Sequence, residues 1–145
     1  MEFELARVLL VDDDPTSRLT LQTVLQAGGY HVDAAASAAE AVGKLDEREY
    51  ELVLSDLQME SPEAGYKVLA HARMMDYKPA TAIVTTYQNN SKSDHAGPDH
   101  ARPATQVRML ITPEDIPGLL AKVANMISQR AARKVEREMR HAATY

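Results

Sequence analysis

The chain has 145 residues, of which 45% are hydrophobic and 26% charged, so its composition fits one ordinary globular domain with its own core. It contains no cysteine, which excludes disulfides, thiolate metal sites and cysteine nucleophiles. The formal net charge is −5, and because residues 128–145 carry five basic and two acidic side chains, residues 1–127 carry −8. An acidic body argues against nucleic-acid binding. The N-terminal residues lack the pattern of a signal peptide and no apolar run has membrane-spanning length, so we expect a cytoplasmic protein without a membrane partner.

Short apolar runs alternate along the chain with segments of helical periodicity. Strands are predicted over Ala6–Val11, His31–Ala35, Leu52–Leu54, Ala82–Val84 and Val107–Ile111. The more polar His31–Ala35 is typical of an edge strand. The other four runs are mainly apolar and do not alternate, with Arg7 and Arg108 as their charged residues, as in parallel strands buried on both faces. Helices between such strands predict βαβ units and therefore a single parallel α/β sheet.

The first three helices are predicted from apolar stripes and from helix-terminal residues. The first stripe ends at Gly28-Gly29, which is a good stop signal for a helix. Ser37 and Glu40 have the spacing of a capping box, which opens the second helix. A third stripe runs from Val68 to Met75.

Two later segments depart from this rhythm. Tyr87–Ala101 stands where a fourth helix belongs, but it is polar and has no apolar stripe, so we expect that helix to be short or irregular. The last helix is predicted from Ile116 to about Arg140, further than one face of a domain needs. We therefore divide the chain into a domain of residues 1–128 and a C-terminal helical extension of residues 129–145. The basic side chains of the extension are expected to form a solvated helix face.

Carboxylates and a hydroxyl follow three of the predicted strands. Asp12 and Asp13 come directly after the first strand, Asp56 follows Leu52–Leu54, and Thr85 follows Ala82–Val84. Sites in open α/β sheets form where the carboxyl ends of neighbouring strands meet. Clustered carboxylates repel one another and need a cation, and an oxygen-only ligand set favours Mg²⁺. A carboxylate beside Mg²⁺ can act as a nucleophile toward a phosphoryl group.

Three motifs, in this order and spacing, carry a resemblance to a known family. Val8–Pro15 (VLLVDDDP), Glu51–Met59 (ELVLSDLQM) and Ala82–Tyr87 (AIVTTY) resemble the receiver domains of two-component response regulators. The resemblance covers roughly residues 5–128. It implies a flavodoxin-like, doubly wound sheet of five parallel strands in the order 2-1-3-4-5.

The resemblance also implies a role for each site residue. Asp56 is the phosphoacceptor, which takes a phosphoryl group from a histidine kinase or a phosphotransfer protein. Mg²⁺ is held by Asp13, Asp56 and the backbone carbonyl of Gln58, with Asp12 acting through water. Thr85 is the hydroxyl that follows the phosphoryl group in the switch. A receiver is a signalling domain that acts by protein contact, so the resemblance does not imply an enzyme.

The sequence departs from the family pattern at the end of the fifth strand. Thr112 stands where the family has a lysine, and Met109 stands where it usually has an aromatic switch residue. Because Thr112 is short and neutral, it cannot pair with a phosphoryl group as the lysine does. We therefore expect weakened switching, and a degenerate receiver that binds proteins independently of phosphorylation is the alternative. The sequence does not identify the downstream protein partner. It is compatible with a homodimer, formed either through the face of the fourth helix, fifth strand and last helix or through the C-terminal helix.

An enzyme is a third interpretation. Asp12–Thr16 also satisfies the DxDxT motif of haloacid-dehalogenase-type phosphatases, in which Asp12 would be the nucleophile and Asp14 the acid/base. Such enzymes need a further acidic pair downstream, and the sequence has no Asp-Asp pair after this motif. That interpretation also leaves Asp56 without a role.

Overall fold

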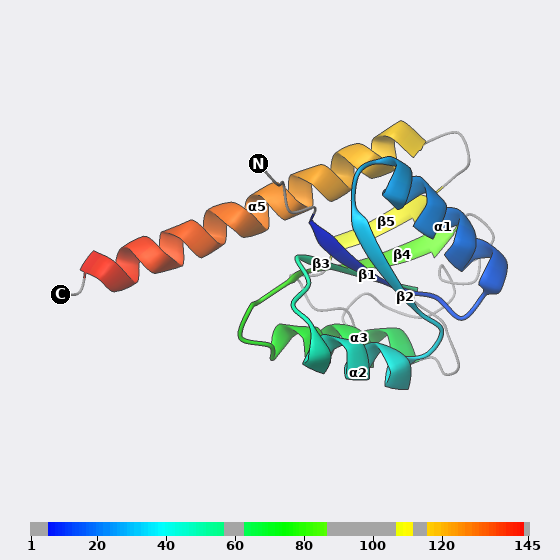
Figure 1. Cartoon of the computed structure of the whole chain (residues 1–145), viewed down its shortest axis with the longest axis horizontal. Helices are drawn as coiled ribbons and strands as arrows, with labels where there is room; N and C mark the ends of the chain where they lie inside the picture. Colours follow the sequence, from blue (N-terminus) through cyan, green and yellow to red (C-terminus); the bar gives the residue numbers. More distant parts are fainter. Residues whose placement is uncertain (1–5, 57–62, 87–106, 112–115, 144–145) are drawn as a thin grey trace, which may run out of the picture.

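A computed structural model describes residues 6–56, 63–86, 107–111 and 116–143 of the chain. Five parallel strands in these segments form one sheet in the order β2-β1-β3-β4-β5 (Figure 1). They are β1 (Arg7–Val11), β2 (His31–Ala35), β3 (Leu52–Asp56), β4 (Ala80–Thr86) and β5 (Val107–Ile111). The predicted strand order is confirmed, and β2 lies at an edge of the sheet as its polar sequence indicates.

Helices cover both faces of this sheet. They are α1 (Pro15–Ala27), α2 (Ala38–Glu47), α3 (Ala64–Arg73) and α5 (Ile116–Ala143). In Figure 1, α1 and α5 lie on one face, while α2 and α3 lie on the other. The short or irregular helix expected within Tyr87–Ala101 lies outside the described residues.

Some predicted boundaries are wrong by a few residues. β3 and β4 run on to Asp56 and Thr86, because the neighbouring strand continues to supply ladder partners: Asp56 pairs with Val84, and Thr86 with Ile111. Backbone pairing does not require an apolar side chain, so the polar ends of these strands were not recognised as strand. At its C-terminal end, α3 stops at Arg73 instead of reaching Met75.

The core consists of two clusters, one on each face of the sheet. Side chains of each strand alternate between the faces, and both faces are covered, which explains the mainly apolar, non-alternating strand sequences. The cluster under α1 and α5 includes Val8, Leu10, Leu52, Leu54 and Val123. The cluster under α2 and α3 includes Leu9, Val11, Val53, Ile83 and Leu69.

The predicted helix ends at α1 and α2 are confirmed. The Ser37 hydroxyl accepts a hydrogen bond from the Glu40 N–H at 3.1 Å, and the Glu40 carboxylate accepts one from the Ala36 N–H at 2.9 Å. The carboxylate thus reaches one residue further back than in a standard capping box. After α1, Gly29 has φ 99°, a left-handed conformation that favours glycine.

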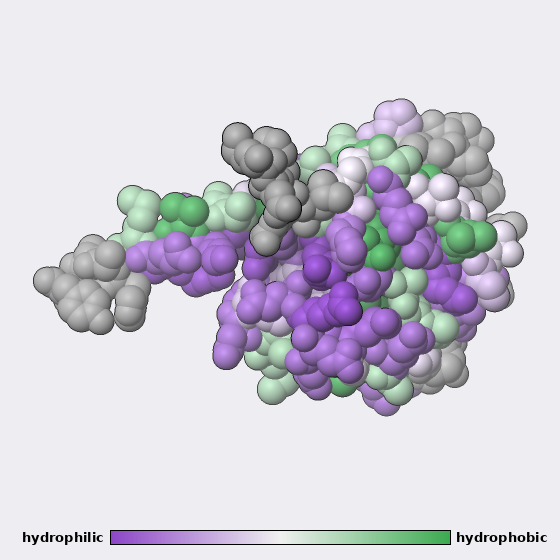
Figure 2. All heavy atoms as spheres, in the orientation of Figure 1, coloured by the Kyte–Doolittle hydropathy of each residue, from purple (hydrophilic) through white to green (hydrophobic). Residues whose placement is uncertain are grey.

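The last helix, α5, is 28 residues long and continues beyond the sheet (Figure 1). All side chains of residues 131–140 are exposed, as the predicted solvated face requires, but Arg130 is buried, and for this residue the prediction is wrong. Figure 2 shows hydrophilic residues along one side of the projecting part and hydrophobic residues along another. Val135 and Met139 are exposed hydrophobic residues of α5. In the described part of the chain, no helix is both long enough and apolar enough to cross a membrane.

Candidate functional site

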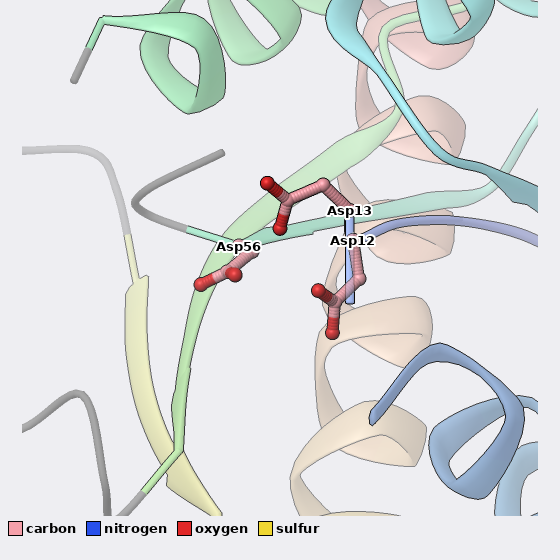
Figure 3. Close-up of side chains that lie close together, drawn as sticks. All are labelled: Asp12, Asp13 and Asp56. Atoms are coloured by element: carbon pink, nitrogen blue, oxygen red, sulfur yellow. The ribbon is translucent and has the colours of Figure 1, made fainter. Parts of the chain in front are cut away.

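Three carboxylates meet at the carboxyl ends of β1 and β3. Asp12 follows the last residue of β1, and Asp56 ends β3. Because Val11 pairs with Ser55 in the β1–β3 ladder, the next residues, Asp12 and Asp56, lie level with each other. Carboxylate oxygens of Asp12, Asp13 and Asp56 all lie within 4.8 Å of one another (Figure 3). The structure thus brings together the three aspartates that the sequence predicts as one acidic site.

Burial makes this cluster electrostatically costly without a cation. Asp12 is only 3% exposed and Asp56 only 8%, whereas Asp13 is exposed. Burial is the main cause that raises the pKa of Asp12 above its ordinary value of 3.8, and the charges of Asp13 and Asp14 act in the same direction. Hydrogen bonds from the Asp14 N–H and with Asp56 partly oppose this rise in pKa. A bound cation would stabilise the charged form of all three carboxylates, so this geometry can hold a metal ion.

Backbone and side-chain hydrogen bonds fix the position of Asp12. Its Oδ1 accepts a hydrogen bond from the Asp14 N–H at 3.0 Å, and its own N–H donates to the Ala35 carbonyl at 3.0 Å. The Arg18 guanidinium donates to the Asp12 carbonyl at 2.9 Å. The sequence analysis did not predict this role of Arg18. The one feature that could have indicated it is the position of a basic residue in the first turn of the helix that follows the aspartates.

Asp14 has a different role from its neighbours, because it is the N-cap of α1. Its Oδ2 accepts a hydrogen bond from the Ser17 N–H at 3.0 Å. Hydrogen bonds from Ser17 are the main cause that lowers the pKa of Asp14 below 3.8. A carboxylate that caps a helix and has a lowered pKa is a poor proton donor, which argues against the acid/base role that the phosphatase interpretation assigns to Asp14.

The backbone also gives the positions of two further predicted site residues. Val84 is the ladder partner of Asp56, and Thr85 is the next residue of β4. Met109 of β5 pairs with Val84 on the other side. Thr85 therefore follows the strand position beside Asp56. The other two predicted residues, Gln58 and Thr112, lie outside the described residues.

Comparison with known proteins gives the class to which this fold and this acidic site belong. The family model of the response regulator receiver domain matches residues 8–101, which span β1 to β4 and all three aspartates. The chain therefore belongs to the response regulator receiver domain family.

Individual relatives are similar over part of their own length. The chain is 38% identical over 78 residues to the gliding motility regulatory protein of Myxococcus xanthus, covering 54% of this chain and 10% of that protein. It is 42% identical over 67 residues to the two-component response regulator ARR11 of Arabidopsis thaliana, covering 45% of this chain and 13% of that protein. Among solved structures, response regulator TrrA of Thermotoga maritima, in complex with Mg²⁺–BeF, is 27% identical with a TM-score of 0.63, covering 84% of this chain and 99% of that one. The chain thus spans about an eighth or less of the two curated relatives.

Proposed function

We propose that this chain accepts a phosphoryl group on Asp56, in a magnesium-dependent reaction, from a histidine kinase or a phosphotransfer protein. The observation that carries the proposal is the cluster of Asp12, Asp13 and Asp56, whose carboxylate oxygens lie within 4.8 Å of one another. The solved structure of the related TrrA, which holds Mg²⁺–BeF, supports the choice of metal and of phosphoryl chemistry.

Each aspartate has its own part in the proposed reaction. Asp13 and Asp56 would hold the metal together with the backbone carbonyl of Gln58, and Asp12 would act through water. Magnesium supplies positive charge that offsets the carboxylates and the oxygens of the transferring phosphoryl group. A carboxylate oxygen of Asp56 forms the new P–O bond while the bond from phosphorus to the donor breaks, and its electron pair leaves with the donor group. Because the β1–β3 ladder fixes the backbone of Asp56 beside Asp12, little reorganisation is needed for this step.

The test is the intact mass of the protein after incubation with acetyl phosphate and Mg²⁺. The wild type is expected to gain one phosphoryl group, and Asp56→Asn none. Asp76→Asn is the matched control, because it removes an exposed carboxylate outside the cluster, and it is expected to be labelled like the wild type. Absence of the adduct on the wild type, under conditions that label an ordinary receiver, would overturn the proposal in favour of a phosphorylation-independent binding module.

Two sequence features support weakened switching after phosphorylation. Thr112 replaces the lysine that pairs with the phosphoryl group in the family, and Met109 replaces the aromatic residue. Backbone amide shifts on addition of beryllofluoride and Mg²⁺, a mimic of the phosphorylated state, test this part of the proposal. We expect the shifts to be confined to the surroundings of Asp56, and large shifts that reach Met109 would contradict weak coupling.

A further inference from the structure

A groove with a volume of about 570 Å³ opens at the opposite end of the sheet from the aspartates. It lies between α5 and the connection from α3 to β4, and Ala80, the first residue of β4, contributes to its lining. Val84, the ladder partner of Asp56, is four residues further along β4, a distance of about 13 Å in an extended strand. The groove is therefore separate from the acidic site.

The walls of the groove are strongly basic. Among the described residues, four cationic side chains and no carboxylate line it; the four are Arg73, Lys78, Arg133 and Arg137. None of these four forms an ion pair with any side chain in the described part of the protein. Several cationic side chains around one concave surface, without anionic partners nearby, attract anionic groups.

One nitrogen among these cations lacks a hydrogen-bond acceptor in the described part of the chain. The Nη2 atom of Arg73 is buried and has no hydrogen-bond partner within the described residues. A buried donor without an acceptor costs free energy, and structures generally satisfy such donors with a protein group, a water or a ligand. This atom is itself inaccessible from the groove, so Arg73 lines the groove through its other atoms.

The groove is held open by a buried arginine of α5. Arg130 is 8% exposed, and its guanidinium donates to the Lys78 carbonyl at 3.1 Å and to the Tyr77 carbonyl at 2.7 Å. The Lys78 backbone has φ 45°, and its Nζ donates to the Arg73 carbonyl at 2.8 Å. The two Arg130 hydrogen bonds fix the α3–β4 connection against α5, and the Lys78 bond braces the connection itself, so the cationic walls are in place before a ligand binds.

The shape and floor of the groove indicate the kind of ligand. Gln129, Arg133 and Arg137 recur every four residues along α5 and form a row about 12 Å long, which suits an elongated ligand better than a single ion. The floor is apolar, because Pro79, Ala80 and Met126 line it as well. The charge of −8 on residues 1–127 would repel a long nucleic acid at a distance, whereas a short acidic segment is affected mainly by the nearby cations.

We propose that this groove binds an acidic, amphipathic segment of a partner protein. Its carboxylates would pair with Arg133, Arg137 and Arg73, and its apolar side chains would rest on the floor. Helix-in-groove recognition of this kind needs an apolar contact for affinity and charges for register.

The test is fluorescence anisotropy with a labelled synthetic peptide of 15 residues, with glutamates along one helical face and leucines along the other. The wild-type chain is expected to bind it saturably and less tightly as salt is raised. Arg133→Glu and Arg137→Glu should each weaken binding by about fivefold or more. Lys134→Glu is the matched control, because Lys134 is exposed on the same helix and does not line the groove, and its affinity should stay within about twofold of the wild type.

Three results would overturn this proposal: no binding of the peptide, an equal loss in Lys134→Glu, or tighter binding of a single-stranded 15-nucleotide DNA than of the peptide. Circular dichroism of each variant checks that the fold is kept. Asp56→Asn is expected to bind the peptide like the wild type. The outcome at the groove is thus distinguishable from the outcome of the phosphorylation experiment.

Discussion

The two ends of the sheet have opposite charge and are built in different ways. At the carboxyl end, Asp12, Asp13 and Asp56 come from the ends of two adjacent strands, and a backbone ladder fixes their spacing. At the amino end, the basic groove lies between the α3–β4 connection and α5. The hydrogen bonds that hold these two elements together link residues 52 and 53 positions apart in the sequence. The net charge of −5 hides this separation. A modest average charge is therefore compatible with two concentrated surfaces of opposite charge on one small domain.

A second contrast lies within the basic region itself. Arg130 is buried and satisfied by two backbone carbonyls, so its role is structural. Arg133, less than one turn further along α5, is exposed and forms no ion pair among the described side chains. Similar residues on one helix thus divide between holding the groove together and lining it.

Replacing Arg130 is expected to have the largest effect on stability. Arg130→Leu keeps much of the apolar contact but leaves the Tyr77 and Lys78 carbonyls without their donors, so we expect the free energy of unfolding to fall by about 3 kcal/mol. Urea unfolding measures this change. Arg133→Leu, the exposed neighbour, should change it by no more than about 0.5 kcal/mol. Equal effects of the two substitutions would contradict the division of roles within α5.

Mg²⁺ bound at the acidic end should raise the free energy of unfolding by a somewhat smaller amount than Arg130→Leu lowers it. A ligand that binds only the folded state at 100 times its Kd raises the free energy of unfolding by about 2.7 kcal/mol. We expect Mg²⁺ to raise the thermal midpoint of the wild type, relative to a sodium control of equal ionic strength, because it offsets the three clustered carboxylates. Asp13→Asn should lose most of this increase, while Asp76→Asn should keep it. An undiminished increase in Asp13→Asn would place the ion elsewhere.

The acidic site was predictable from the sequence because each of its parts is local. Continuously apolar runs mark buried parallel strands, and a residue directly after such a run lies at the carboxyl edge of the sheet whatever the rest of the chain does. Asp12 stands directly after such a run, and Asp56 stands one residue further on, after Ser55. The polar ends of β3 and β4 were missed, since the pattern records side-chain burial and not ladder pairing.

The basic groove was not predictable in the same way. Arg130 appears in the sequence as one of several basic residues in a helical tail, and a pattern of charges does not reveal which of them reaches a carbonyl on another element. Arg73 and Arg133 are likewise distant in sequence and become neighbours across the groove only through the packing of α5. Arg18 was missed for a related reason, because its partner is a backbone carbonyl and not a side chain.

The contributions of Asp12 and Asp14 to stability should depend on pH in opposite directions. These effects on the free energy of unfolding should be smaller than those of Arg130→Leu and of Mg²⁺. In metal-free protein, burial raises the pKa of Asp12 above 3.8, so the folded state binds this proton more tightly than the unfolded state does. The contribution of Asp12 to stability therefore falls as pH rises from 3.8 through its folded pKa. Asp12→Asn should remove that fall and stabilise the metal-free protein at neutral pH by on the order of 1 kcal/mol.

Asp14 should show the reverse dependence. Its pKa is lowered mainly by hydrogen bonds from Ser17, so its contribution is present above 3.8 and is lost as pH falls through its folded pKa. Asp14→Asn keeps a good N-cap residue but removes this pH-dependent part, leaving a slightly less stable protein at neutral pH. Urea unfolding of both variants in EDTA, from acidic to neutral pH, measures the two slopes. If both substitutions shifted stability in the same direction, the distinction between a buried site carboxylate and a helix cap two residues away would be wrong.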